Sequence, residues 1–176
     1  NPIYNAMHGR RPALKVRATG TADVVDTVNF ARERSLLVAV RGGGHSVAGL
    51  STCDGGIVID LTRMRAVTVD PVARRASVQG GAVWADVDRE TQAFGLVVPG
   101  GVVSETGVGG LTLGGGLGYL TRRFGWTVDN LEEVEIVTAD GSVRTANREE
   151  HSDLFWAVRG GGGNFGVVTS FLFRLH

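Results

Sequence analysis

The sequence predicts an α+β domain with two lobes, a small α/β lobe followed by a lobe with a mixed or antiparallel sheet and helices. Over residues 1–65, short apolar runs alternate with a stretch of helical spacing, which is typical of strands joined by helices. From residue 66 to residue 176, apolar runs come in pairs separated by turn residues, which indicates hairpins. Hydrophobic residues make up 43% of the chain and charged residues 20%, the composition of a folded globular protein.

The elements of the small lobe follow one another closely. A short strand around residues 14–17 precedes a helix with Thr21 as its expected N-cap. The apolar residues of that helix recur at helical spacing, at Val24, Val25, Val28 and Ala31. Two apolar runs, 36–41 and 57–61, then read as buried strands, which completes a strand–helix–strand–loop–strand unit.

The second lobe is expected to contain two hairpins and a closing strand. Its strands are expected at residues 66–70, 76–79, 131–138, 142–145 and 167–175. Helices are expected at 82–94, ending before Gly95, and at 153–158, capped by Ser152. Residues 96–99 read as a short extended segment, and 100–118 as one long loop. Because the last strand has no closing element after it, we expect the chain to be a piece of a longer protein.

Composition excludes several classes of function. Eighteen basic and eighteen acidic residues cancel, so the chain has no field of positive charge for nucleic acid. The single Cys53 excludes an internal disulfide framework, but it fits a cytoplasmic and a secreted protein equally. No apolar run has the length of a membrane span, and no signal peptide is visible. The four histidines have no metal-type spacing, so we expect no metal site.

Glycine is the unusual component, and its positions mark loops that face a ligand. The chain has 27 glycines, about 15% against an average usage of roughly 7%. They gather at 42–44, 107–118 and 160–163 without a collagen-like period. The first group follows a strand directly, so its backbone N–H groups can form a concave cradle for an anion such as phosphate. His45 comes next in the chain and places a titratable, nucleophilic imidazole beside that cradle.

The first glycine loop differs from two common phosphate-binding motifs. No helix begins at it, as the dinucleotide-binding G-x-G-x-x-G motif requires, and no Gly-Lys-Ser/Thr follows, as in a P-loop. The second group carries seven glycines in the thirteen residues 107–119, which is costly to order unless the backbone packs closely against something. The third group is explained equally well by the end of a helix and a turn. Three such loops together favour one extended ligand of the nucleotide type.

The motifs resemble those of the flavin-linked oxidases of the vanillyl-alcohol oxidase/berberine bridge enzyme superfamily, in their FAD-binding (PCMH-type) domain. The segments that match, in the family's order, are RPAL (11–14), RGGGHS (41–46), GVGG (107–110), LGGGLG (113–118) and DLFWAVRGGGGNFGVVT (153–169). They span nearly the whole chain. The resemblance implies a domain that holds FAD in an extended pose between its two lobes, here residues 1–65 and 66–176.

The resemblance also implies which residues contact the cofactor. The expected cofactor-binding residues are Arg41, Gly42, Gly43, Gly44, His45, Ser46, Gly49, Thr106, Gly107, Gly109, Gly110, Gly114, Gly115, Gly116, Gly118, Gly166, Val167 and Val168. In the family, the position of His45 bonds covalently to the methyl carbon of the flavin ring, which raises its redox potential. Some members add a cysteinyl link, but Val103 stands at the aligned position here, so only the histidyl link is expected.

The expected activity is that of an FAD-linked oxidoreductase that oxidises an alcohol, sugar or amine carbon, with oxygen reoxidising the reduced flavin. Family members carry a further substrate domain with the catalytic base. That domain is expected to be absent here, so we assign no catalytic residue and expect the fragment to be inactive alone. Two alternatives remain at this point: an NADPH-dependent reductase of the same fold, and a non-catalytic nucleotide-binding or dimerisation fragment. FAD and a small-molecule substrate are the expected partners, without nucleic acid or membrane.

Overall fold

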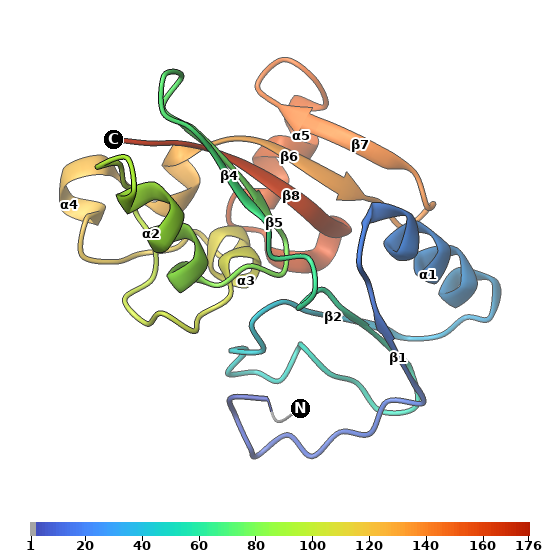
Figure 1. Cartoon of the computed structure of the whole chain (residues 1–176). Helices are drawn as coiled ribbons and strands as arrows, with labels where there is room; N and C mark the ends of the chain where they lie inside the picture. The colour runs from blue at the N-terminus through green and yellow to red at the C-terminus, as the bar shows by residue number, and fades with distance from the viewer. Residues whose placement is uncertain (1–2) are drawn as a thin grey trace.

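The computed structural model describes residues 3–176 and contains a parallel sheet and an antiparallel sheet with helices packed around them (Figure 1). The α+β class predicted from the sequence is therefore confirmed. The parallel sheet comes from residues 14–60 and the antiparallel sheet from residues 67–174, so the two sheets share no strand. Within the described residues, no helix is both long and apolar enough to cross a membrane.

The parallel sheet has three short strands in the order β1-β3-β2. They are β1 (Leu14–Arg17), β2 (Val38–Arg41) and β3 (Ile57–Asp60). All four residues of the central strand β3 are buried, as expected of a parallel strand that is covered on both faces. Its last residue, Asp60, pairs with Arg17 on one side and Arg41 on the other. All three strands therefore end at one edge, from which the first glycine loop leaves.

The antiparallel sheet has five strands in the order β4-β5-β8-β6-β7. They are β4 (Val67–Asp70), β5 (Arg75–Gln79), β6 (Leu131–Val137), β7 (Val143–Asn147) and β8 (Val167–Arg174). Every pairing is antiparallel, so of the two expected sheet types the antiparallel one is correct. The last strand of the chain lies at the centre of the sheet (Figure 1).

The main core lies on one face of the antiparallel sheet, under α2 (Trp84–Gln92), α3 (Val108–Leu113) and α5 (Ser152–Val158). Its largest members are Trp84, Phe171 and Phe173, each at most 1% exposed. The two phenylalanine rings stack at 5.9 Å, and Trp84 lies 6.4 Å from Phe173. Burying one such side chain contributes about 1.5–3 kcal/mol, so these rings anchor the helices to β8.

A second apolar cluster connects the two sheets through α1 (Thr21–Glu33). Val24 and Val28 of this helix share the cluster with Ile59 of the parallel sheet and with Val137 and Val167 of the antiparallel sheet. The first helix therefore packs at the junction and fixes how the edge that carries the glycine loop meets β8.

Several expected boundaries were wrong. Thr21 is the first residue of α1 rather than its cap, and its hydroxyl donates instead to Glu135 at 2.7 Å. Ser152 is likewise the first residue of α5, which His151 precedes with a left-handed φ of 46°. The helix expected at 82–94 is shorter, because α2 spans Trp84–Gln92.

The largest error concerns the expected loop 100–118, which contains the helix α3. Two of its six residues are glycines, so intrinsic propensity argues against a helix there. Tertiary packing overrides propensity, because Val108 and Thr112 are fully buried. The short helix α4 (Thr121–Phe124) and two 3₁₀ turns, η1 (Thr127–Asn130) and η2 (Gly162–Phe165), also form in stretches without a helical pattern.

Candidate cofactor-binding site

The first glycine loop, residues 42–49, follows the end of β2 and forms neither strand nor helix. No helix begins within residues 42–49, as the sequence predicted. Gly44 and Gly49 take left-handed φ angles of 74° and 70°, which favour glycine. Among the described residues, no backbone carbonyl accepts a hydrogen bond from the amides of residues 42–46. Buried or half-buried amides need an acceptor, so this row of donors fits the oxygens of an anionic group.

The second glycine segment touches the first. A Cβ atom on Gly43 would lie 2.4 Å from the backbone nitrogen of Gly107, closer than real Cβ contacts occur. The reverse also holds, because a Cβ on Gly107 would lie 2.4 Å from the nitrogen of Gly43. Gly107 is the residue before α3, and it forms an isolated β-bridge with Val83. Thr106 next to it is held by backbone bonds to Trp84 and Val103. The two segments therefore form one continuous backbone surface.

Gly80 extends this junction to the antiparallel sheet. A Cβ on Gly42 and a Cβ on Gly109 would each lie 3.2 Å from the carbonyl oxygen of Gly80. A Cβ on Gly80 would in turn lie 2.4 Å from the carbonyl oxygen of Val168, near the start of β8. Gly80 was not among the residues predicted from the sequence, although the Gly-Gly pair that follows a strand was a usable signal. Two of the three glycine groups and the first residues of β8 thus meet at one place.

Gly110 faces open space on this surface. A Cβ on Gly110 would meet nothing within 4 Å, although its neighbour Gly109 is packed against Gly80 and Phe171. The helix α3 therefore presents one glycine inward and one outward, and a ligand can approach the backbone closely at Gly110.

The other glycines of the second segment pack elsewhere. A Cβ on Gly116 would clash with the Thr127 hydroxyl at 2.4 Å, and one on Gly118 with the Gly100 carbonyl at 1.8 Å. Gly115 has a left-handed φ of 107° and lies against Trp126, whereas Gly114 is exposed. The contacts of Gly115, Gly116 and Gly118 explain these glycines by folding alone. Their contact with a cofactor stays a prediction.

The third glycine group lies at the entry to β8. Gly166 has a φ of 147°, and a Cβ there would lie 2.4 Å from the carbonyl oxygen of Val137 on β6. Val167 and Val168 are buried in β8. Gly166 and Val167 therefore serve the sheet, and only Val168 reaches the junction, through its carbonyl contact with Gly80.

His45 is half-buried at the end of the first loop. Its ring stacks on the ring of Tyr4, with centroids 4.6 Å apart and planes 15° from parallel. The Ser46 hydroxyl accepts a hydrogen bond from the Leu50 amide at 3.0 Å, and the Gly49 amide donates to the Ser46 carbonyl at 3.2 Å. These bonds close a turn, so the Ser46 side chain holds the shape of the loop after His45.

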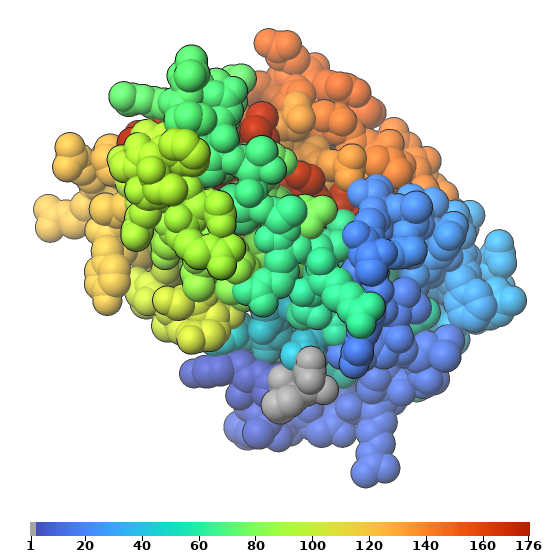
Figure 2. Space-filling model, viewed as in Figure 1, coloured from blue at the N-terminus to red at the C-terminus, as the bar shows by residue number. Residues whose placement is uncertain are grey.

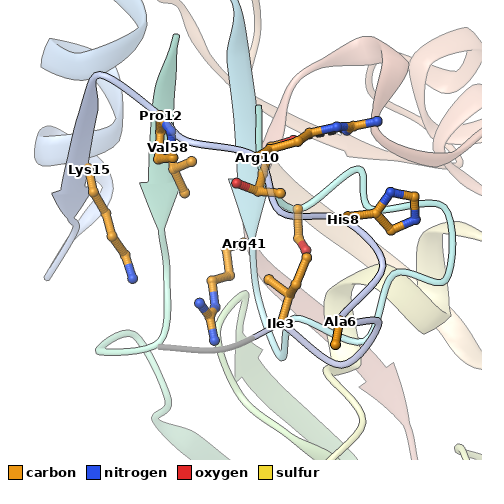
Figure 3. Close-up of a pocket in the computed structure, with 10 residues that line it drawn as sticks. Ile3, Ala6, His8, Arg10, Pro12, Lys15, Arg41 and Val58 are labelled. Carbon is orange, nitrogen blue, oxygen red and sulfur yellow. Dashed lines mark hydrogen bonds between the residues drawn. The ribbon is translucent and has the colours of Figure 1, made fainter. Parts of the chain in front are cut away.

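Positive charge lies behind the first loop. The Arg41 guanidinium is buried, and a Cβ on Gly44 would lie 3.3 Å from its Nε atom. Arg41, Arg10 and Lys15 line one cavity of about 460 Å³ (Figure 3). Lys15 also pairs with Asp60 at 2.6 Å. Burial raises the pKa of Asp60, but hydrogen bonds from Lys15 and Thr62 outweigh it, so this pKa lies below its usual value. The carboxylate therefore stays charged and neutralises only part of the positive field.

Comparison with known proteins identifies the family of this domain and the ligand of that family. Residues 12–147 match the family described as FAD binding domain, which is more than half of the chain. The chain belongs to this family. The match also confirms the resemblance to the vanillyl-alcohol oxidase/berberine bridge enzyme superfamily, because the similar proteins and structures include FAD-linked oxidases and a BBE-like protein.

Individual relatives match almost all of this chain. It is 47% identical to "FAD-linked oxidoreductase pgmH" of Aspergillus terreus, over 98% of this chain and 35% of that protein. The crystal structure of 6-hydroxy-D-nicotine oxidase from Arthrobacter nicotinovorans superposes with a TM-score of 0.97 at 40% identity, over 99% of this chain and 39% of that one. Glucooligosaccharide oxidase from Acremonium strictum gives a TM-score of 0.94 at 34% identity, over 98% of this chain and 37% of that one. That structure is described with a 6-S-cysteinyl, 8α-N1-histidyl FAD.

The chain thus spans little more than a third of the length of these relatives. The residues present fit the cofactor of this family, because the amides of residues 42–46 donate to no backbone carbonyl of the described residues and are of the type that suits the oxygens of a pyrophosphate. FAD binding is therefore assigned to this domain.

Proposed function

We propose that the intact protein is an FAD-linked oxidoreductase in which this domain holds the cofactor and a further substrate domain covers the flavin. In such a protein, residues 1–65 and 66–176 of this domain would form two lobes on either side of an extended FAD. One observation carries it: the backbone contact of Gly43 with Gly107 joins two glycine segments into a single surface of the kind that an elongated cofactor requires. The oxidoreductase and oxidase names of the relatives support the reaction class.

Different residues at the junction would contact different parts of FAD. The amides of residues 42–46 would bind the pyrophosphate, and the Arg41 guanidinium behind Gly44 adds a positive charge to them. The open face of Gly110 would let the cofactor lie directly on the α3 backbone. When bound, FAD supplies the hydride acceptor for an alcohol, sugar or amine carbon, while the protein orients it and tunes its potential.

His45 would attach the flavin covalently. Its half-buried position at the end of the cradle supports this role, as does the 8α-N1-histidyl FAD named for a relative that is 34% identical. An imidazole nitrogen of His45 would bond to the 8α-methyl carbon while the methyl group loses one proton and the imidazole loses its N–H proton. FAD would accept the two electrons released, and oxygen would then take them up with two protons as hydrogen peroxide.

A second, cysteinyl link is not proposed. Val103 stands at the aligned position, and it is 45% exposed. The only cysteine, Cys53, is 3% exposed and lies near the carbonyl of Leu37, just before β2, and that of Ile57 in β3. A buried thiol without an activating group is inert. The histidyl bond is therefore the single covalent link expected here.

Purified full-length protein tests the reaction class. We expect flavin absorption bands in the visible region and oxygen consumption with hydrogen peroxide formation when a suitable alcohol, sugar or amine is supplied. Screening sugars and cyclic amines separately identifies which class is oxidised. Reduction of the flavin by NADPH without oxygen consumption would favour a reductase instead, and a colourless protein that does not take up FAD would contradict the proposal.

A further inference from the structure

The N-terminal segment, residues 3–11, lies along the glycine loop and is bonded to it at several points. In Figure 1 this segment runs beside the stretch that follows β2, and Figure 2 shows it at the surface of the molecule. The Tyr4 amide donates to the Gly44 carbonyl at 3.0 Å, and the Asn5 side chain to the Val47 carbonyl at 2.7 Å. Arg10 donates to the Gly49 carbonyl at 2.9 Å. The bonds therefore bracket the loop on both sides of His45.

His8 fixes the far end of the same loop. A Cβ on Gly49 would lie 2.4 Å from Cγ of His8, so the imidazole ring lies directly against this glycine. The Nε2 atom of His8 is 3.0 Å from the Val47 carbonyl. Because Gly44 and Val47 are both held by the N-terminal segment, the backbone of His45 has little freedom to shift, and only its side-chain torsions remain to be fixed.

The ring of Tyr4 contacts the His45 side chain. Its ring stacks on the His45 ring at 4.6 Å and 15°, yet 68% of Tyr4 is exposed, so burial in the core does not explain where the ring lies. Offset stacking of aromatic rings is favourable in its own right. A stacked ring covers one face of an imidazole and leaves its edge accessible. The lone pair or proton of each ring nitrogen lies in the plane of the ring and points outward at that edge. The stacking therefore orients the reactive edge without covering it.

We propose that Tyr4 is a positioning residue for the covalent attachment of the flavin at His45. Its ring holds the plane of the imidazole so that one nitrogen edge faces the place where the 8α-methyl carbon would lie. The inference rests on the proposed function, since it requires FAD attached through His45. Its consequence is kinetic, because a side chain that must search for the attacking orientation reacts more slowly, while binding of the cofactor's pyrophosphate is untouched.

The test uses full-length apoprotein mixed with FAD and compares Tyr4→Leu with Tyr4→Phe. Acid precipitation at successive times measures how fast flavin becomes inseparable from the protein. We expect Tyr4→Leu to slow attachment by about tenfold or more, because a small misplacement of reacting atoms has large effects on rate. Tyr4→Phe keeps the stacked ring and should attach flavin at a rate within about twofold of the parent protein.

Non-covalent affinity separates positioning from a general structural role. In the His45→Ala background no bond can form, so the dissociation constant of FAD is measured directly, and adding Tyr4→Leu should leave it unchanged. Attachment by Tyr4→Leu at the parent rate would overturn the inference. So would equal slowing by Tyr4→Phe, which would point to the hydroxyl, or weakened FAD binding in the double variant, which would point to folding. If the parent protein itself never retains flavin after acid, the covalent link proposed above fails, and this inference fails with it.

Discussion

The α-carbons of Gly43 and Gly107 lie so close that a Cβ on Gly43 would come within 2.6 Å of the Gly107 α-carbon. The two residues belong to different glycine segments, far apart in the sequence. Only a pair without side chains permits this approach. The contact places the amides of the first loop beside α3, the helix in which a Cβ on Gly110 would meet open space.

Gly43→Ala should therefore separate the two segments. The added methyl group meets backbone atoms at 2.4 and 2.6 Å, and backbone cannot move aside as a flexible side chain can. We expect the free energy of unfolding to fall by about 1–3 kcal/mol, the usual cost of overpacking, and FAD affinity to fall with it. Denaturant titration and FAD titration of the apoprotein measure the two effects.

Gly163→Ala is the matched control for that variant. Gly163 belongs to the third glycine group, has a φ of −84°, and a Cβ there would meet nothing within 4 Å. Gly163→Ala should change neither the free energy of unfolding nor the affinity for FAD appreciably. Equal stability and FAD affinity in Gly43→Ala and Gly163→Ala would show that the contact with Gly107 is unimportant.

Gly110→Ala should weaken FAD binding without lowering the stability of the apoprotein. Because its Cβ enters open space, the substitution does not disturb packing, and alanine in place of glycine stabilises a helix by about 0.5–1 kcal/mol. The same methyl group would occupy space that the cofactor needs. We expect an apoprotein that melts at the same or a higher temperature but binds FAD more weakly. Unchanged FAD affinity would mean that Gly110 does not face the cofactor.

Asp60→Asn should lower the free energy of unfolding at neutral pH. It should also make that free energy depend less on pH in the acid range. The hydrogen bonds to Lys15 and Thr62 hold the pKa of Asp60 in the folded protein below the usual value of 3.8, although burial acts the other way. A depressed folded pKa means that the carboxylate stabilises the fold above pH 3.8 and that this contribution disappears as the pH falls through the folded pKa.

The expected loss for Asp60→Asn at neutral pH is about 2 kcal/mol, the scale of a hydrogen bond to a charged group. The difference from the parent protein should shrink below pH 3.8, as urea titrations across pH will measure. Glu33→Gln, on an exposed pair with Arg34, serves as a control that should change little. A constant difference between Asp60→Asn and the parent at every pH would contradict the assignment.

Most of the sheet structure could be predicted because most strands contain apolar residues, in a run or in alternation with polar ones, between turn residues. The pair Asp140-Gly141 predicts the turn between β6 and β7, for example. The helix α3 could not be predicted, because its glycines lower its propensity and only its buried contacts hold it in place. Sequence patterns carry local preference, whereas α3 depends on partners that are distant in the chain.

For the candidate site too, sequence patterns predicted the segments that stand out locally but not the contacts between distant residues. The first loop and Gly107 stand out by composition alone, and they do meet. Gly80 was missed because its importance comes from the Val168 carbonyl, a contact between distant residues. Tyr4 was missed because a single aromatic residue near a chain end carries no pattern, and its relation to His45 exists only in three dimensions.

Acid precipitation of the full-length protein tests the central claim most directly. The first glycine loop is proposed to hold FAD with His45 bonded to the flavin, so yellow colour should remain with the precipitated parent protein. His45→Ala should release all of its flavin into the supernatant while still binding FAD before acid treatment, and its flavin should have a lower redox potential and turn over more slowly. Complete release of flavin from the parent protein, or retention by His45→Ala, would contradict the account.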